Sequence, residues 1–514
     1  MNDERVEEPG AIPSKTPGVL QELFSVDVRS LAVLRVGIAL LVMVDLARRI
    51  GWTRLFHSDY GVLTASQASE FLGPGYWSLY WLNGSPWFAS TLFVVTGLAA
   101  VGLLVGYQTR WMTAACLVLV WSLQICNPML LTAGHILMRM MLFWMLFLPV
   151  ATVWSIDAST RKRNVGSRQI LSVGSAAILL QIAYMYFFSG LAKWNPYWIG
   201  GSAMQYAMNF EMYVKPAGQW LAQYPDWLQF LTLLTLAAEI FGPVLMFIPR
   251  YSGWFRGFFM GFFWLLHLSI WLTMSTGLFS FVAMIAWVVF VPAEIWNVFL
   301  GDGADTRNAS QIIAVRRGKW FSNGIATLFL IYITLQNILF LFPQKSNSTT
   351  ASTNQIQVAT NAVEVFGRIT MTIQQFRMFD TPPLYDPWYE YGATLMDGRQ
   401  VELFTGQFTP LGQRPESVYD AMQNQYWRRL HWNLTTHPSN PPEKIQVYEQ
   451  IRQRLLLNIV ERWNDRHPNN PVVTAWLKCY LEPIDLDRVD SEEPPAATLP
   501  ILWAHYQRSA GDFP

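Results

Sequence analysis

The sequence predicts an α-helical multi-pass membrane protein with about nine transmembrane helices and a C-terminal extracytoplasmic α+β domain. Of its 514 residues, 52% are hydrophobic and only 14% are charged, whereas soluble proteins carry about 25% charged residues. Apolar runs of about 20 residues, the length that crosses a bilayer, recur through the first two thirds of the chain. The 24 Trp and 32 Phe residues are typical of aromatic belts at membrane interfaces. The lipid bilayer is therefore the first expected partner.

The predicted spans follow a short polar arm, residues 1–29, and together form a transmembrane domain over residues 30–343. They lie at roughly 31–48, 87–107, 111–127, 136–154, 173–193, 228–249, 254–272, 277–299 and 320–343. The third span is the least regular, because Gln124 and Asn127 sit near its end. A long aromatic loop, about 49–86, is expected to lie along the membrane interface between the first two spans.

Basic residues are unevenly distributed between the two sides of these spans. The N-terminal arm and the loops on its side hold 14 Lys and Arg, and the opposite loops hold 5. The positive-inside rule therefore places the N-terminus in the cytoplasm and everything after about residue 344 outside. In a bacterial cell this predicts the inner membrane. The acidic, polar start does not resemble a cleavable signal peptide, so the first span is expected both to target the chain to the membrane and to anchor it there.

A linker rich in Ser, Thr and Asn, residues 344–354, is expected to lead into a small α+β domain, residues 355–514, with an acidic, Pro-rich tail. In this domain Asp397-Gly398 predicts a β-hairpin turn, and helices are expected at about 415–430 and 442–467. The formal charge of +1 excludes a strongly polybasic nucleic-acid binder. Three cysteines cannot build a zinc-type cluster, so no metal is expected, and whether Cys126 pairs with Cys479 stays open.

Ionisable residues inside apolar segments are costly and usually face a cavity or a partner. They are Arg35, Asp45, His135, Arg139, Lys193, Glu239, His267 and Glu294. His135 and Arg139 are four residues apart at a helix start, so they share a face. By the predicted topology, the helix ends that carry His135 and Lys193 lie at the same depth near the outer surface. This predicts that the two residues approach one another across an outer-side cavity.

Two interpretations of Lys193 stay open. As an interface anchor, its stem would lie in hydrocarbon while its ammonium reaches water. As a general base, it would be kept neutral because burial disfavours the charged form. Arg35 and Glu239 are expected to tie helices together, and a lone histidine such as His267 is more often a satisfied structural residue.

Three segments carry a resemblance to a known family. They are S-L-A-V-L-R-V-G-I-A-L-L-V-M-V-D-L near the N-terminus, G-H-I-L-M-R-M-M-L-F-W-M-L-F-L-P-V-A-T-V-W-S-I-D from Gly134 to Asp157, and S-G-L-A-K-W-N-P-Y-W-I-G-G-S-A-M around Lys193. Over about residues 25–300 the chain resembles the horizontally transferred transmembrane (HTTM) domain family, which includes the vitamin K-dependent γ-glutamyl carboxylases. The third segment matches the carboxylase pattern at Gly190, Lys193, Trp198, Gly201 and Met204. Ala192 and Gly134 depart from that pattern, which has a lysine and an asparagine there.

The resemblance implies roles for individual residues. Lys193 would be the catalytic base that deprotonates vitamin K hydroquinone or another menaquinol-type quinol, and His135 would assist the carbanion step. The expected substrate-binding residues are Arg139, Trp194, Trp198 and His267.

Three functions follow as expectations. The first is an enzyme in which a lipid-soluble quinol and oxygen generate a strong base, so that CO2 is added to an acceptor, such as a polypeptide, at the outer face. The second is a quinone- or lipid-binding HTTM protein without carboxylation. The third is a scaffold or transporter in which the charges merely brace helices. The absence of a visible internal repeat and the position of the ionisable pair at the membrane edge speak against transport.

Overall fold

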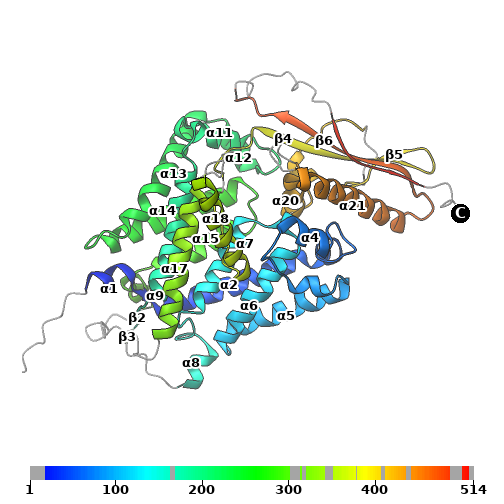
Figure 1. Cartoon of the computed structure of the whole chain (residues 1–514). Helices are drawn as coiled ribbons and strands as arrows, with labels where there is room; N and C mark the ends of the chain where they lie inside the picture. Colours follow the sequence, from blue (N-terminus) through cyan, green and yellow to red (C-terminus); the bar gives the residue numbers. More distant parts are fainter. Residues whose placement is uncertain are drawn as a thin grey trace, which may run out of the picture.

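The computed structural model describes residues 18–161, 168–300, 313–314, 320–341, 351–377, 379–406, 411–435, 442–486 and 500–508. Most of the predicted arm, most of the predicted linker and the acidic tail lie outside the described residues. A bundle of helices fills one part of the molecule, and a sheet with its own helices lies at one end of that bundle (Figure 1).

Seven helical segments in the described part of the chain are long and apolar enough to cross a membrane. They are Val28–His57 (α2, Val28–Arg49, continued by η1, Ile50–Trp52, and α3, Thr53–His57), α5 (Pro86–Val105), α6 (Thr109–Cys126), α9 (Val173–Ala192), α13 (Pro225–Leu245), α14 (Ser252–Thr273) and α17 (Trp320–Leu341). An eighth candidate, Phe279–Phe290 with Ala293–Leu300, bends by 97°. The chain is thus a multi-pass helical protein, but the predicted count of nine spans is not confirmed.

The fourth predicted span shows why the count differs. Its helix, α7, covers only Ala133–Met145, and turns follow over residues 146–154. Eleven of its 13 residues are buried against other helices. An apolar pattern on every side of a helix is expected both for a membrane span and for a helix buried in a protein core. The sequence pattern alone therefore predicted a full span here.

Shorter helices connect and cover these segments. They are α1 (Val19–Phe24), α4 (Ala65–Leu72), η2 (Leu79–Leu82), η3 (Pro128–Leu130), α8 (Ile156–Arg161), α10 (Pro196–Ile199), α11 (Ala203–Met208), α12 (Pro216–Ala222), α15 (Phe279–Trp287), η4 (Val288–Phe290), α16 (Ala293–Leu300) and α18 (Ala351–Ile369). The aromatic loop expected along the interface therefore contains α3, α4 and η2, and it buries Phe56 and Tyr80.

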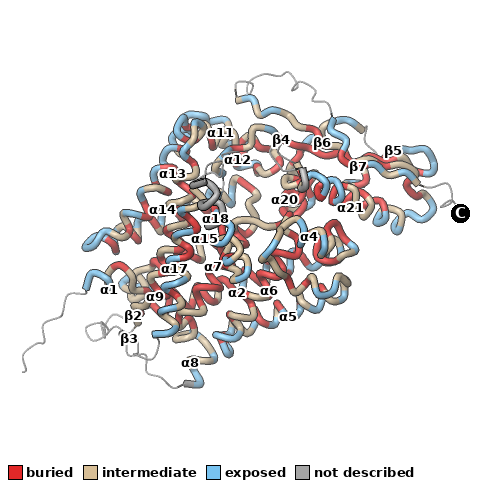
Figure 2. The backbone as a smooth tube through the Cα atoms, in the orientation of Figure 1, coloured by how far each residue is buried: buried red, intermediate tan, exposed pale blue. Residues whose placement is uncertain are grey.

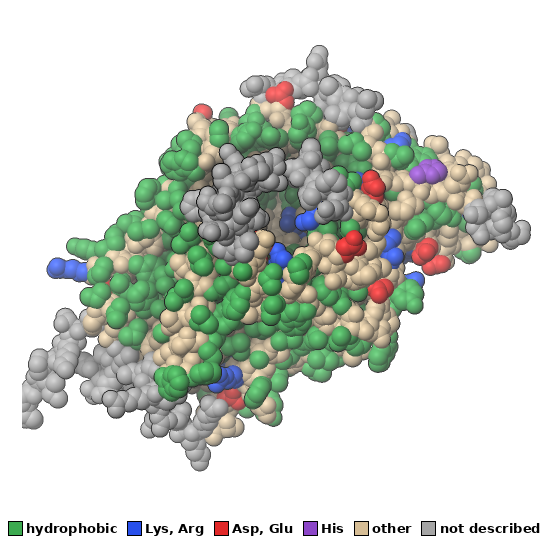
Figure 3. Space-filling model, viewed as in Figure 1, with side chains coloured by type: hydrophobic (Ala, Val, Ile, Leu, Met, Phe, Trp, Pro, Cys, Tyr) green, Lys and Arg blue, Asp and Glu red, His purple; other side chains and the backbone are tan. Residues whose placement is uncertain are grey.

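The bundle has a buried interior and an apolar exterior. Buried residues line the facing sides of α2, α7, α9 and α15 (Figure 2). The outward faces of α5, α13, α14 and α17 expose large apolar side chains, among them Leu98, Phe241, Leu265 and Ile331. Hydrophobic side chains dominate this surface in Figure 3, whereas charged ones gather toward the C-terminal sheet. An exterior of this kind suits lipid.

Two small sheets lie at opposite ends of the bundle (Figure 1). One has the strand order β1-β2-β3, with β1 at Val26–Asp27, β2 at Gln169–Leu171 and β3 at Ile313–Ala314. The other is antiparallel in the order β5-β4-β6-β7, with β4 at Tyr385–Leu395, β5 at Gln400–Glu402, β6 at Val472–Pro483 and β7 at Ile501–Gln507.

The C-terminal elements bear out several expectations. The predicted hairpin is β4–β5, with Gly398 at φ 82° in its turn. The predicted helix 442–467 is α21 (Pro442–Arg466), and the other splits into α19 (Val418–Ala421) and α20 (Gln425–Leu434). Cys126 and Cys479 are each buried free thiols, so the disulfide left open by the sequence is not formed.

An ion cluster fastens the C-terminal sheet to the helical bundle. The Arg414 guanidinium lies 3.0 Å from carboxylate oxygens of Glu211 and Asp386 and 2.6 Å from one of Glu482. Glu211 belongs to the loop between α11 and α12, whereas the other two acids lie on β4 and β6. Burial, reinforced by the neighbouring Glu211 carboxylate, raises the pKa of Asp386 to about 7.

Candidate functional site

A cavity of about 240 Å³ lies among α9, α11, α13 and α14. An apolar cavity of about 150 Å³ holds benzene, so this one has room for a fused ring. Its wall is mostly apolar, and its ionisable side chains in the described part are Lys193, Glu239, His267 and Tyr186. Leu234 and Leu265 also line it, although both are exposed on the outer surface of α13 and α14. The cavity therefore reaches the surface that faces lipid.

Lys193 ends α9 and points into this cavity wall, only 3% exposed. Its Nζ donates to Glu239 Oε2 at 2.5 Å and to Ser189 Oγ at 2.8 Å. It also lies 5.1 Å from the ring centre of Trp198, a favourable cation–π distance. A snorkelling anchor needs its ammonium in water, so this placement does not suit an anchor.

The local sequence explains how Lys193 is held. Ser189 lies one turn earlier on the same helix face. Asn195 then caps α10 by accepting from the backbone N–H groups of Tyr197 and Trp198. This cap starts the short helix that brings the Trp198 ring over the ammonium.

Glu239 is the partner of Lys193, a pairing that sequence reasoning did not predict. A Cβ at Gly190 would lie 2.9 Å from Cγ1 of Ile240 and 3.2 Å from Cβ of Glu239, so glycine permits α13 to approach α9 closely here. In the sequence, Glu239 stood out as an acidic residue in an apolar span. That observation does not show which helix α13 packs against. Glu239 does tie two helices together, as expected, and its partner is Lys193.

A segment from the far C-terminal half closes the cavity. The indole N–H of Trp198 donates to the Phe379 carbonyl at 2.7 Å, and Asn195 Nδ2 donates to the Asp380 carbonyl at 2.6 Å. Phe379 and Pro382 themselves line the cavity. This contribution was not anticipated from the sequence.

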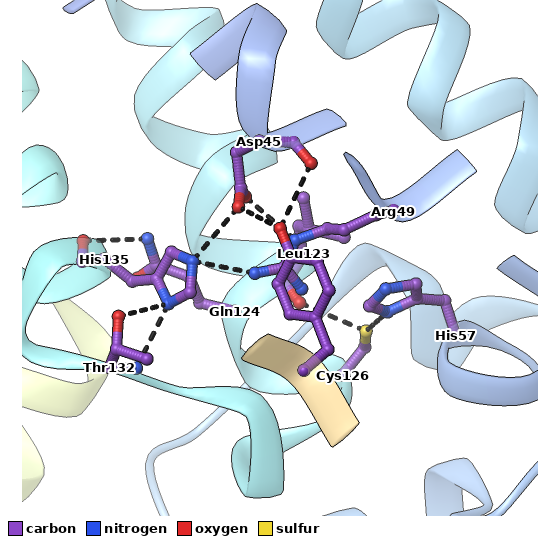
Figure 4. Close-up of polar contacts among 9 residues, drawn as sticks. Asp45, Arg49, His57, Leu123, Gln124, Cys126, Thr132 and His135 are labelled. Carbon is purple, nitrogen blue, oxygen red and sulfur yellow. Dashed lines mark hydrogen bonds and ion pairs between the residues drawn. The ribbon is translucent and has the colours of Figure 1, made fainter. Parts of the chain in front are cut away.

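His135 belongs to a second buried group, shown in Figure 4, that is built around Asp45. Asp45 Oδ2 accepts from Arg49 Nε at 2.9 Å, and Asp45 Oδ1 lies 3.2 Å from His135 Nε2. The Thr132 backbone N–H donates to His135 Nδ1 at 3.1 Å. Both ring nitrogens are thus engaged by protein groups.

The same cluster joins the helical bundle to the C-terminal domain. Tyr426 of α20 donates its hydroxyl to Asp45 Oδ1 at 2.8 Å, and its ring lies 4.6 Å from the Arg49 guanidinium carbon. Beside it, His57 Nδ1 lies 3.1 Å from Cys126 Sγ (Figure 4). The contact between Asp45 and Tyr426 of α20 was not anticipated from the sequence.

The structure separates the predicted site residues into two sets. Lys193, Trp198 and His267 line the cavity. His135 and Arg139 are buried but lie outside its lining, and Trp194 is 69% exposed. The predicted approach of His135 to Lys193 across one cavity is therefore not what the structure shows.

Arg139 has structural partners in this arrangement. Its guanidinium donates to Gln124 Oε1 at 3.0 Å and to the Ile373 carbonyl. It also stacks 4.8 Å from the Trp121 ring centre. These contacts hold α7 against α6 and against the segment that follows α18.

Gly134 lies where the helix that carries His135 contacts the helix that contributes Phe279 to the cavity wall. A Cβ there would lie 2.8 Å from Cα of Phe279, so glycine permits close contact between α7 and α15. Phe279 lines the cavity, so the start of α7, which carries His135, packs behind this part of the cavity wall. Among the described residues, no group of three or more His, Cys, Asp or Glu could hold a metal ion.

Comparison with known families gives one assignment. The HTTM domain model matches residues 24–296, more than half of the chain. Comparisons with curated proteins and with solved structures each gave no match. The match includes Lys193, Glu239, Asp45 and His135, whereas Phe379 and Tyr426 lie beyond it, and the apolar helices agree with it. The chain therefore belongs to the HTTM domain family of membrane proteins.

Proposed function

We propose that this protein binds a lipid-soluble quinol in the cavity and that Lys193 and Glu239 remove a proton from it, in a reaction resembling that of the vitamin K-dependent γ-glutamyl carboxylases. The observation that carries the proposal is the buried Lys193–Glu239 pair in an apolar cavity that reaches the lipid-facing surface. A quinol dissolved in the bilayer reaches such a site without crossing water.

The pair supplies the proton transfer. At 2.5 Å, the Lys193 ammonium can pass one proton to the Glu239 carboxylate, which leaves a neutral amine and a neutral acid. The amine then accepts the proton of the quinol hydroxyl, and the new ammonium stabilises the quinol anion. A quinol bound there would supply, on its oxidation by O2, the strong base that takes a proton from an acceptor so that CO2 can add to the resulting carbanion. The apolar wall keeps bulk water from quenching that base.

Under this proposal His135 is a positioning residue. Its ring nitrogens are engaged by Thr132 and Asp45, and its helix packs behind Phe279 in the cavity wall. His135 thus fixes the position of α7 and of the wall, rather than contacting the quinol.

Filling the cavity tests the proposal. Ala207 lines the cavity, whereas Ala237 lies on the exposed face of α13. In lipid nanodiscs, Ala207→Phe is expected to weaken binding of vitamin K hydroquinone at least about 10-fold, while Ala237→Phe leaves it unchanged. Binding can be followed by quenching of tryptophan fluorescence under nitrogen. Equal affinity in the two variants would place the ligand elsewhere, and quinol binding without CO2 incorporation into any acceptor would favour the non-carboxylating alternative.

We also propose that the N-terminus is cytoplasmic and the C-terminal domain lies outside, with the bacterial inner membrane as the location if the source is bacterial. The excess of basic residues on the N-terminal side supports this orientation. An alkaline phosphatase fused to the C-terminus is expected to be active. A fluorescent C-terminal fusion combined with an inactive phosphatase fusion would reverse the orientation.

A further inference from the structure

Three polar side chains from three helices form a hydrogen-bonded series that ends in the cavity wall. The indole N–H of Trp287 (α15) donates to the Tyr186 hydroxyl (α9) at 2.8 Å. That hydroxyl lies 2.5 Å from Nε2 of His267 (α14). The side chains of Trp287, Tyr186 and His267 are 0%, 3% and 2% exposed, so each polar atom needs a protein or ligand partner.

Counting donors fixes the tautomer of His267. A tyrosine hydroxyl has one proton and two lone pairs, and an indole N–H can only donate. If Nε2 of His267 carried the proton, Tyr186 would accept twice, and its own proton would lack an acceptor among the described residues. If Nε2 is unprotonated, it accepts the Tyr186 proton and the whole series is satisfied. The neutral ring then carries its proton on Nδ1.

The Nδ1–H group of His267 is the one donor of this series that lacks an acceptor among the described residues. It is buried and has no hydrogen-bond partner among the described residues. A buried N–H without an acceptor is rare because it forfeits its hydrogen bond to water. His267 lines the cavity, but its Nδ1 atom has almost no accessible surface. A small movement of the cavity lining would therefore bring the missing acceptor, supplied by what the cavity holds, to Nδ1.

We propose that His267 donates its Nδ1–H to an oxygen of the cavity ligand, and that Tyr186 and Trp287 position the ring in this donating tautomer. The inference rests on the proposed function: the reacting hydroxyl of the quinol lies at Lys193, and its second oxygen lies at His267. Tyr186 on α9 and Lys193, the C-cap of α9, are seven residues apart, which is about two turns on one face. The two polar ends of the cavity therefore select an aromatic ring with oxygens at opposite ends over a ring with one oxygen.

Two substitutions of His267 distinguish loss of the Nδ1–H donor from loss of the imidazole ring as a whole. Asn at this position places an amide N–H near the original Nδ1, whereas Leu offers no donor, and neither side chain places an acceptor at the original Nε2. Under nitrogen, His267→Leu is expected to weaken binding of 1,4-naphthalenediol about 10-fold, and His267→Asn to stay within about 3-fold of the unsubstituted protein. Binding of 1-naphthol should be the same in all three, because its one oxygen pairs with the charged groups at Lys193.

The outcomes distinguish the two proposals. If the unsubstituted protein does not bind the diol, the proposed function fails. If it binds the diol and His267→Leu binds equally well, the proposed function stands and the role of His267 is refuted. Equal losses in the Leu and Asn variants would also refute the donor role, because only one of them removes the donor.

A ligand-independent readout tests the positioning residues. In protein with 15N-labelled histidine, nuclear magnetic resonance distinguishes a proton on Nδ1 from one on Nε2, and the chain has 7 His to assign. The His267 proton is expected on Nδ1, and Tyr186→Phe should shift it toward Nε2. Tyr184→Phe, two residues away on the same helix, is the matched control and should leave the tautomer unchanged. A proton on Nε2 in the unsubstituted protein would overturn the inference.

Discussion

Lys193→Arg is expected to abolish quinol-dependent turnover, with a loss of about 10²–10⁴-fold, the usual contribution of a general base. Arginine preserves the positive charge and can still pair with Glu239, but it does not release its proton at any accessible pH. The variant therefore keeps the positive charge of the site and removes the proton transfer. Expression, membrane insertion and unfolding temperature should stay close to those of the unsubstituted protein.

A matched control is available in Lys215. Its Nζ lies 5.3 Å from the ring centre of Trp271 and donates to a backbone carbonyl, so it too is an aromatic-paired lysine, but it does not line the cavity. Lys215→Arg should leave turnover unchanged. Lys193→Ala should be as inactive as the Arg variant, and added small amines are expected to restore part of its activity. Turnover like that of the unsubstituted protein in Lys193→Arg would contradict the base assignment.

A substitution of Glu239 separates its role as proton acceptor from its role in positioning Lys193. Glu239→Gln keeps the volume and one hydrogen-bond acceptor for Lys193, yet it removes the group that receives the ammonium proton. The same assay should therefore show a lower rate with quinol binding largely retained. If Glu239→Gln instead weakens quinol binding and leaves the rate at saturating quinol unchanged, the carboxylate only holds the lysine in place.

Much of the fold could be predicted from apolar run length, because crossing lipid and burying a helix both demand it. Apolar run length misled at α7, where a 13-residue helix with 11 residues buried by protein looked like the core of a span. The hairpin turn at Asp397-Gly398 and the helix α21 were predictable from local signals, since turn chemistry and helical spacing act over a few residues.

The site was predictable in its residue types but not in its pairings. Lys193 and Trp198 were both named as site residues, because the segment that carries them resembles the carboxylase pattern. Glu239 lies 46 residues from Lys193, and Tyr426 lies 381 residues from Asp45. Helix adjacency determines such contacts, and a single sequence does not state which helices are adjacent. The prediction that His135 and Lys193 face each other rested on matched depth and on the family resemblance, and neither defines the direction around the bundle.

Asp45→Ala is expected to be the most destabilising single substitution in the Asp45 cluster. It would leave Arg49, which is 2% exposed, as an uncompensated buried charge and would also remove acceptors from His135 and Tyr426. Breaking a buried ion pair in this way costs about 3–5 kcal/mol. Tyr426→Phe removes one hydrogen bond and should cost about 1 kcal/mol. Unfolding in detergent, followed by tryptophan fluorescence, measures both.

The double variant Asp45→Leu with Arg49→Met separates charge from packing. If the cluster's main role is to neutralise Arg49, removing both charges together should recover most of the stability lost in Asp45→Ala, since apolar replacements of buried pairs are often tolerated. Because His135 belongs to this cluster and its helix packs behind the cavity wall, the double variant should also lower the affinity for quinol less than Asp45→Ala does. A double variant as unstable as Asp45→Ala would show that the polar contacts to His135 and Tyr426, rather than the neutralised charge, hold α2, α7 and α20 together.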